Sequence, residues 1–292
     1  MNNFTIILPV YNDWRSLNIL LKKIENSLKK LKKTYRILLI NDNSREKNVF
    51  KLNKNNRFKS IEILNLEKNV GSQKAIATAL KYIKKNKNKY GDKFIIMDSD
   101  GEDDPSKIKE IINIINRNKK LDIITLNRTL RKESFLFSFL YEVHLFITFL
   151  ITFNYIRFGN FTYINKKVLL KLSNKKDLWL AYSATLCKFF KNRYAIKANR
   201  KKRIYGKSKM SYLGLIKHSL NIQAVYKKNI FVIYTLYTLA LISFSFFSAI
   251  NILIIIFLFI FHIIILINFA QWNVNDITFY TCLNNIKSVK KL

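Results

Sequence analysis

Short apolar runs alternate with amphipathic stretches over the first 126 residues of the chain. The runs have the length of buried strands and cover residues 4–9, 35–40, 61–66, 94–97 and 121–126. The stretches between them carry apolar residues at helical spacing and cover residues 13–30, 73–85 and 105–116. Strands that alternate with helices in this way predict an α/β fold with a mostly parallel sheet and helices on both faces.

Residues 230–270 form a much longer apolar segment of 41 positions without Lys, Arg, Asp or Glu. At about 1.5 Å per residue they would make roughly 60 Å of helix, twice the thickness of a bilayer core of about 30 Å. Lysines precede the segment at 227 and 228 and follow it at 287, 290 and 291. This pattern predicts a transmembrane helical hairpin with its turn near 248–251 and both ends on the cytoplasmic side. A buried hairpin of core helices is the alternative.

Residues 135–153 and 211–226 are apolar but carry ionisable residues such as Glu142, His144 and Lys217. The combination predicts two helices at a membrane interface, with a core helix as the alternative for the first. The expected organisation is therefore an α/β domain over 1–226, a membrane hairpin over 227–272 and a cytoplasmic tail over 273–292. No secretory leader pattern begins the sequence.

Composition narrows the class of protein. Of the 292 residues 49% are apolar, which excludes a disordered chain, and two cysteines exclude a disulfide scaffold. Lys and Arg number 52 against 18 Asp and Glu, giving a formal charge of +34. These cations are dispersed along the chain rather than gathered in a basic arm, so we expect a membrane as partner and no nucleic acid.

Carboxylates crowd together after the fourth apolar run, where five lie between Asp98 and Asp104. Ligands of parallel sheets bind at the carboxyl ends of strands, so this cluster marks a candidate site. Such crowding requires a cation or several basic side chains for neutralisation. Oxygen ligands suit Mg²⁺ or Mn²⁺, and Asp98 and Asp100 are the predicted ligands. Asp103 and Asp104 serve equally well as caps of the helix expected to begin near residue 105.

Four motifs in order resemble those of family 2 glycosyltransferases. They are Pro9-Val-Tyr-Asn-Asp13, Asn41-Asp-x-Ser44, Asp98-x-Asp100 followed by Glu102-Asp103, and Arg203-x-Tyr-Gly206-x-Ser208-Lys209. The nearest branch is that of dolichol-phosphate mannosyltransferases and polyprenyl-phosphate glycosyltransferases, and the resemblance covers about residues 4–225. It implies a GT-A fold for the α/β domain.

The resemblance also implies a role for each motif. Pro9, Tyr11 and Asp13 would lie at the nucleotide end of the site and Asp42 at the base, although Pro9 as a strand stop and Asp42 as a turn residue fit the sequence equally. Asp98, Asp100 and Glu102 would hold the metal. Arg128, Arg203, Ser208 and Lys209 would contact phosphates, the last three from a loop that closes over them. Asp103 is the candidate general base.

Two positions depart from the family pattern. Asn41 stands where relatives usually carry a first aspartate before Asp42. Residues 156–161 lack the acidic residue that many relatives carry near this point, and Arg157 adds a charge of the opposite sign. We expect the first departure to affect which nucleobase the donor site prefers. We expect the second to make the acceptor contacts of this chain differ from those of the family.

The reaction implied by the resemblance is an inverting, metal-dependent transfer from a nucleotide-diphosphate sugar to a polyprenyl phosphate at the cytoplasmic face of a membrane. A phosphate monoester with a second pKa of about 6 is largely ionised at neutral pH, so this acceptor needs no dedicated base. Two alternatives stay open: transfer to a glycan or diphosphate-linked lipid of surface polysaccharide, and an inactive membrane-tethered binding protein. The sugar, the nucleobase, the prenyl length and a homo-oligomeric state stay open as well.

Overall fold

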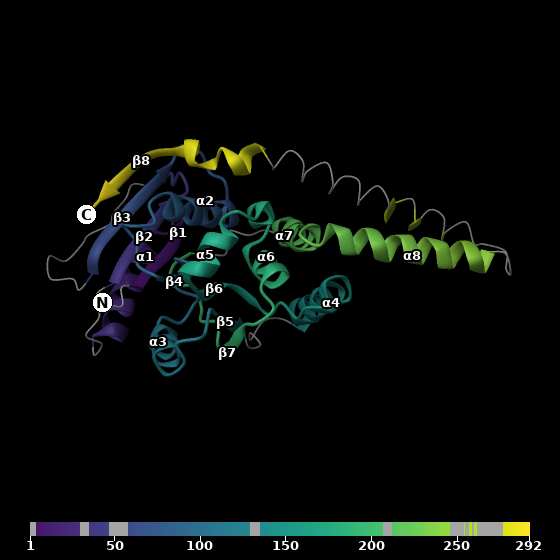
Figure 1. Cartoon of the computed structure of the whole chain (residues 1–292), viewed down its shortest axis with the longest axis horizontal. Coiled ribbons are helices and arrows are strands. Elements are labelled where there is room, and N and C mark those ends of the chain that lie inside the picture. Colours follow the sequence, from purple (N-terminus) through teal and green to yellow (C-terminus); the bar gives the residue numbers. More distant parts are fainter. Residues whose placement is uncertain are drawn as a thin grey trace.

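The computed structural model describes residues 4–29, 35–46, 58–128, 135–206, 212–245, 254, 257–258, 260–261 and 277–292. Its centre is a sheet with the strand order β7-β5-β6-β4-β1-β2-β3-β8 (Figure 1). The strands are β1 (Phe4–Val10), β2 (Tyr35–Asn41), β3 (Phe58–Leu66), β4 (Lys93–Ile96), β5 (Ile123–Arg128), β6 (Phe158–Asn165), β7 (Tyr194–Ala198) and β8 (Ile286–Lys291). All five predicted strands are present.

The sheet is mixed but mostly parallel, as predicted, because only β6 and β8 run against the direction of the other strands. Strands β4, β1, β2 and β3 run parallel to their neighbours in that order, and β5 is parallel to β7. Strand β6 is antiparallel to both β4 and β5, and β8 is antiparallel to β3. The carboxyl ends of β4, β1 and β2 therefore meet at one edge of the sheet, where ligands of such folds bind.

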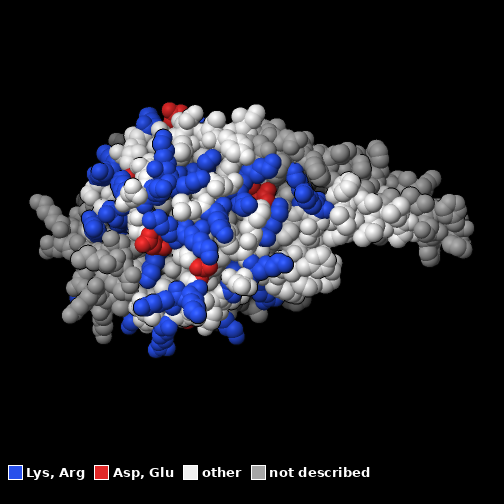
Figure 2. All heavy atoms as spheres, in the orientation of Figure 1, with Lys and Arg blue, Asp and Glu red and all other residues white. Residues whose placement is uncertain are grey.

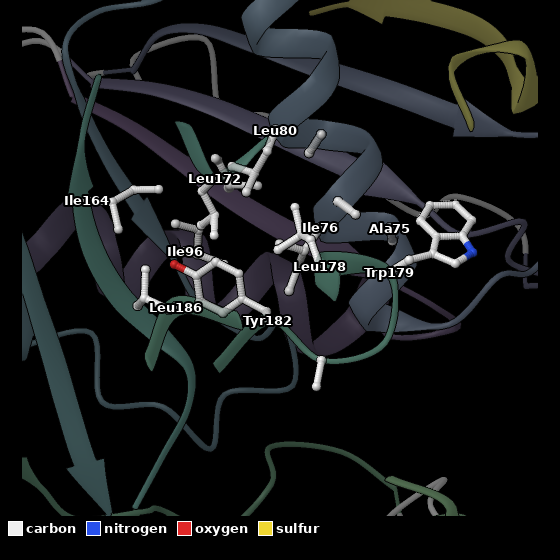
Figure 3. Close-up of a cluster of buried hydrophobic side chains, with 14 of the residues drawn as sticks. Ala75, Ile76, Leu80, Ile96, Ile164, Leu172, Leu178, Trp179, Tyr182 and Leu186 are labelled. Carbon is white, nitrogen blue, oxygen red and sulfur yellow. The ribbon is translucent and has the colours of Figure 1, made fainter. Parts of the chain in front are cut away.

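Helices cover both faces of the sheet, as predicted. Helices α1 (Trp14–Leu28) and α3 (Lys107–Arg117) pack on one face, and α2 (Ser72–Lys85), α5 (Lys166–Leu172) and α6 (Tyr182–Phe189) pack on the other. Along β1, Ile6 and Leu8 face the first layer and Ile7 faces the second. Apolar residues on both faces of one strand explain why these segments are continuous apolar runs. Figure 3 shows the second core, where Ile76 and Leu80 of α2 pack with Leu178, Tyr182 and Leu186.

The prediction of a transmembrane hairpin over 230–270 is wrong. In the described part of the chain, no helix has both the length and the apolar character needed to cross a bilayer. Residues 230–245 belong to α8 (Lys227–Ser245), which begins with two lysines and an asparagine. The remaining sixteen residues make only about 24 Å of helix. Most of 246–270 lies outside the described residues. The predicted localisation as a two-span membrane protein is therefore wrong as well.

Helices α4 (Phe135–Thr152) and α7 (Tyr212–Ala224) lie at the positions predicted for interface helices. They pack against each other and against α8, which extends away from the sheet in Figure 1. The acidic Glu142 inside α4 forms an ion pair with Arg157 at 2.9 Å, just before β6. Arg157, the charge that departs from the family pattern, thus links α4 to the segment that leads into β6.

The segment expected to be a cytoplasmic tail is part of the sheet. Residues 282–285 form the short helix η2 (Cys282–Asn285), and β8 follows directly. Because five of its six residues are exposed, backbone pairing to β3 holds β8 rather than burial of apolar side chains. The sequence pattern of such a strand carries no alternation strong enough to predict it.

Candidate functional site

The first two motifs meet where β1 and β2 end side by side. The N–H of Asn12 donates to the Ser44 hydroxyl at 3.0 Å, and the Asn12 carboxamide accepts the N–H of Arg45 at 2.7 Å. Asn12 adopts a φ of 51°, a left-handed conformation that Asn tolerates better than most residues. Pro9 does not end the first strand, because it pairs in register with Ile40 and β1 continues to Val10.

Asp42 is only 2% exposed, and both of its carboxylate oxygens accept backbone hydrogen bonds. The donors are the N–H groups of Val70 at 2.7 Å and Gly71 at 2.8 Å, at the beginning of α2. Burial raises the pKa of Asp42, and these two donors oppose the rise. Asp42 therefore ties the end of β2 to the start of α2. Its contact with a nucleobase stays a prediction.

Asn41, the second-motif residue that replaces an aspartate, belongs to a row of side-chain amides. Its Nδ2 donates to Oδ1 of Asn65 at 2.9 Å, and Nδ2 of Asn65 donates to the hydroxyl of Ser288 at 3.0 Å. Its Oδ1 accepts the N–H of Ser44 at 3.0 Å. An aspartate at position 41 would lack the donor for Asn65, so the amide suits this arrangement.

A basic segment over residues 199–206 lies along the acidic loop that follows β4. The N–H of Lys201 donates to the carbonyl of Glu102 at 2.8 Å, and the N–H of Ile204 donates to the carbonyl of Asp100 at 3.1 Å. The side chains pair as well: Arg200 with Glu102, and Lys201 with Asp104 at 2.9 Å. Basic neighbours therefore neutralise much of the predicted carboxylate cluster.

Arg203 connects two motifs that lie far apart in the sequence. Its guanidinium binds Oδ2 of Asp100 at 3.2 Å through Nη1 and Oδ1 of Asp13 through Nη2. Gly101, with a φ of 82°, allows the neighbouring Ile204 to pack against the acidic loop, because a Cβ at position 101 would lie 2.3 Å from Cδ1 of Ile204. The structure thus brings Arg203, Asp13 and Asp100 together, while their roles stay predictions. Ser208 and Lys209 lie outside the described residues.

Asp98 lies at the centre of the site. Its Oδ1 accepts a hydrogen bond from Nδ2 of Asn160 at 2.8 Å, and its Oδ2 lies 3.9 Å from Nη2 of Arg128. Its backbone N–H donates to Oδ2 of Asp103 at 3.0 Å. A Cβ at Gly159 would lie 2.2 Å from Nη2 of Arg128, so this glycine provides the space that the guanidinium occupies.

Negative charge is only partly compensated around Asp98. Burial, and then the charge of Asp98, raise the pKa of Asp100 and of Asp103 well above the usual range of a carboxyl group. Asp103 is buried and binds the backbone of Asp98, so its carboxylate shapes the loop. Its role as a general base stays a prediction.

Two of the three predicted metal ligands, Asp98 and Asp100, lie together at the end of β4, whereas Glu102 is engaged elsewhere. Among the described residues, no group of three or more His, Cys, Asp or Glu side chains is arranged to hold a metal ion. Glu102 pairs with Arg200, so it does not join Asp98 and Asp100 in a three-ligand set. Mg²⁺ and Mn²⁺ commonly take one or two protein carboxylates and complete their shell with substrate phosphates. Asp98 and Asp100, whose charges Arg128 and Arg203 compensate only in part, fit that arrangement.

His218 of α7 was not among the predicted site residues. Burial lowers its pKa to about 4, helped by the charges of Arg128 and His144 and opposed by that of Asp98. His218 is therefore close enough to Arg128 and Asp98 to interact with their charges and is neutral at pH 7. Its neighbour Ser219 pairs with Nδ1 of His144 at 2.7 Å, which joins α7 to α4. The sequence signal was one histidine on each of two mostly apolar helices, α4 and α7.

Comparison with known proteins identifies the family. The family model described as Glycosyl transferase family 2 matches residues 5–174, more than half of the chain. The chain therefore belongs to glycosyl transferase family 2. An uncharacterized glycosyltransferase of Synechocystis is 31% identical over 112 residues, covering 37% of this chain and 33% of that protein. An uncharacterized glycosyltransferase of Bacillus subtilis is 24% identical over 110 residues, covering 37% and 32%. Each match spans about a third of the relative's length.

Solved structures share the fold. Mannosyl-3-phosphoglycerate synthase from Rubrobacter xylanophilus is 11% identical with a TM-score of 0.55, covering 78% of this chain and 74% of that one. Glucosyl-3-phosphoglycerate synthase from Mycobacterium tuberculosis, in complex with Mn²⁺, uridine diphosphate and glucosyl-3-phosphoglycerate, is 10% identical with a TM-score of 0.52, covering 78% and 80%. At these identities the similarity shows a common fold, in agreement with the GT-A architecture expected from the motifs.

Proposed function

We propose that this member of glycosyl transferase family 2 transfers a sugar, with inversion, from a nucleotide-diphosphate sugar whose diphosphate binds at the ends of β4 and β1. The observation that carries the proposal is the meeting of Asp13, Asp98 and Asp100 with Arg203 and Arg128 at one edge of the sheet. A diphosphate and a divalent cation together satisfy both the cations and the carboxylates of such a site. The Mn²⁺ and uridine diphosphate in the mycobacterial structure support this interpretation.

Each residue of the site has a distinct task in this reaction. Asp98 and Asp100 would hold Mg²⁺ or Mn²⁺, which when bound neutralises charge on the diphosphate. Arg203 exchanges its carboxylate partners for phosphate oxygens, and Arg128 reaches the diphosphate from the end of β5. Fixed cations around the leaving group stabilise the charge that develops on it as the glycosidic bond breaks.

We further propose a polyprenyl phosphate as the acceptor. Asp103 is engaged with the loop backbone, and a phosphate acceptor needs no general base because it is already ionised at pH 7. Helix α7, which brings His218 toward Arg128, also carries Leu213 at 78% and Ile216 at 58% exposure. A prenyl chain can cover these side chains while its phosphate approaches Arg128. Figure 2 shows Lys and Arg spread over the body of the molecule, which favours an anionic substrate.

A hydroxyl acceptor, on a glycan or a diphosphate-linked lipid, is the second candidate. The observation that favours it is His218, a neutral imidazole within the electrostatic reach of Asp98. A neutral imidazole can take the proton of an attacking hydroxyl group, but with a pKa of about 4 His218 is a weak base at pH 7, which is why this candidate ranks second. The two acceptors differ in their dependence on this residue, because only the hydroxyl needs a base.

The test uses the full chain. Thermal unfolding is measured with UDP, GDP or CDP in the presence and absence of Mn²⁺, and one of them should stabilise the protein only with the metal. The corresponding radiolabelled nucleotide sugars are then incubated with polyprenyl phosphate, and the label is extracted with the lipid. Asp98→Asn and Asp100→Asn should each slow transfer by about a thousandfold, as expected for loss of several kcal/mol of transition-state stabilisation.

Asp92→Asn serves as the matched control, because Asp92 pairs with Lys166 outside the site at 3.0 Å. Its transfer rate should match that of the wild type. No metal-dependent stabilisation by any nucleotide, or equal losses in all three variants, would refute the assignment. Label found on an added glycan rather than in polyprenyl phosphate would refute the acceptor alone.

A further inference from the structure

An unbroken chain of hydrogen bonds connects the backbone of α6 to the carboxylate of Asp98. The N–H of Tyr182 donates to Oε1 of Gln73 at 2.7 Å, and Nε2 of Gln73 donates to Oδ1 of Asn160 at 3.0 Å. Nδ2 of Asn160 then donates to Oδ1 of Asp98 at 2.8 Å. Three elements thus contribute to the position of one carboxylate: α6, α2 and β6.

The two ends of this chain determine the orientation of both amides. A backbone N–H can only donate, so the oxygen of Gln73 must face Tyr182 and its NH₂ group must face Asn160. The oxygen of Asn160 therefore accepts, and its NH₂ group is directed at Asp98. An ionised carboxylate only accepts hydrogen bonds. The carboxylate of Asp98 therefore fits the donor end of this hydrogen-bond chain, and the opposite orientation of the two amides does not.

The surroundings hold this chain rigidly. Asn160 is 7% exposed, and the hydroxyl of Thr162 donates to the backbone carbonyl oxygen of Asn160 at 3.2 Å. The same hydroxyl pairs with the hydroxyl of Tyr182 at 2.6 Å, and neither of these side chains is exposed. Figure 3 shows Tyr182 packed among the apolar residues of the core. Rotation of Asn160 or Gln73 would leave buried polar groups unpaired, which is costly.

We propose that Gln73 and Asn160 are positioning residues that hold Oδ1 of Asp98 and leave its Oδ2 directed at the divalent cation and diphosphate. This inference rests on the proposed function, because it assumes that Asp98 is a metal ligand. Hydrogen bonds from outer side chains commonly orient metal-binding carboxylates and raise metal affinity by about 10- to 100-fold. Residues 156–161 lack the acidic residue that relatives carry and supply Asn160 instead. Asn160 donates to Asp98 without adding negative charge to that of Asp98, Asp100 and Asp103.

The distinguishing variant is Gln73→Glu, which keeps the size and shape of the side chain. The carboxylate still accepts from Tyr182 but has no donor for Asn160, so the Asn160 amide turns and presents its oxygen to Asp98. Asn160→Ala removes the last donor directly. Both should weaken Mn²⁺ binding by about 10- to 100-fold, and the double variant should lose no more than the stronger single variant.

Mn²⁺ affinity is measured from the electron paramagnetic resonance of free Mn²⁺, with the nucleoside diphosphate that stabilises the wild type most. Thr162→Val is the matched control, because it removes a buried hydroxyl beside the chain but no link of it. This control should lower the unfolding temperature and leave Mn²⁺ affinity within about twofold of wild type.

The outcomes separate the two proposals. If the wild type binds Mn²⁺ and both Gln73→Glu and Asn160→Ala bind it with the same affinity, the positioning role is overturned. The proposed function is then unaffected. Equal losses in these variants and in Thr162→Val also overturn the positioning role, because they would reflect the fold alone. No Mn²⁺ binding by the wild type overturns both.

Discussion

The substitution Gly159→Ala should disable the site while leaving the fold intact. The new Cβ would lie 2.2 Å from Nη2 and 2.7 Å from Cζ of Arg128, so the guanidinium must move away from Asp98. Because the displaced atoms are the far end of a flexible side chain, the backbone of β6 need not change. The existing ion pair is 3.9 Å long and partly exposed, so its loss should cost at most about 1 kcal/mol of unfolding free energy.

The effect on donor binding should be larger. A hydrogen bond to a charged group contributes about 1.5–3 kcal/mol, which corresponds to roughly a 10- to 150-fold loss of nucleoside diphosphate affinity. Isothermal titration calorimetry in Mn²⁺ measures the affinity, and thermal unfolding measures the stability of the same samples.

The double variant tests the reasoning. In an Arg128→Ala background, Gly159→Ala has no guanidinium to displace, so it should have no further effect on affinity. If Gly159→Ala weakened binding equally in both backgrounds, the glycine would act through the strand rather than through Arg128.

Three further predictions concern other parts of the site. Gly206→Ala should lower the unfolding free energy, measured in urea, by roughly 1–2 kcal/mol of backbone strain. Gly101→Ala should lower it by more. Both glycines have positive φ, but only Gly101 meets a side chain; equal losses would contradict this. Arg203→Lys keeps the charge but loses the planar fork, so kcat/KM should fall at least about tenfold, whereas exposed Lys197→Ala should cost little. The pKa of His218 is about 4 in the folded chain and about 6.5 when unfolded, so the unfolded state gains protons first. Stability should therefore fall as pH drops from about 6.5 to about 4, and parallel stability curves for wild type and His218→Gln would refute this.

The strands and helices of the α/β sheet were predictable, because their apolar residues are the ones that the fold buries. Residues such as Ile6, Ile7 and Leu8 are apolar because both faces of their strand are covered, and runs of this kind are recognisable in a single sequence. Strand β8 could not be predicted, because backbone pairing with β3 holds it. The hairpin was wrong because it was inferred only from the absence of charge over residues 230–270, and no helix in the described part of the chain is both long and apolar enough to cross a bilayer.

The site was predicted in composition but not in its connections. Strand ends and the spacing of acids located Asp98 and Asp100. The ion pair between Asp13 and Arg203 joins residues 190 positions apart, and only the folded chain shows it. Asn160 and His218 were missed because an amide on a strand and a histidine on an apolar helix carry no motif. Their roles depend on neighbours from other elements.

Strand β8 has a practical consequence for anyone who shortens this protein. It covers the outer edge of β3, with Val289 opposite Leu64 and Lys290 opposite Ile63. Deleting residues 277–292 would leave a nine-residue strand with unpaired backbone groups at the border of the sheet. Bare edges of this kind pair with other chains and promote aggregation. A version trimmed to the α/β region should therefore retain these last residues, joined back to the domain by a short linker, to stay monodisperse.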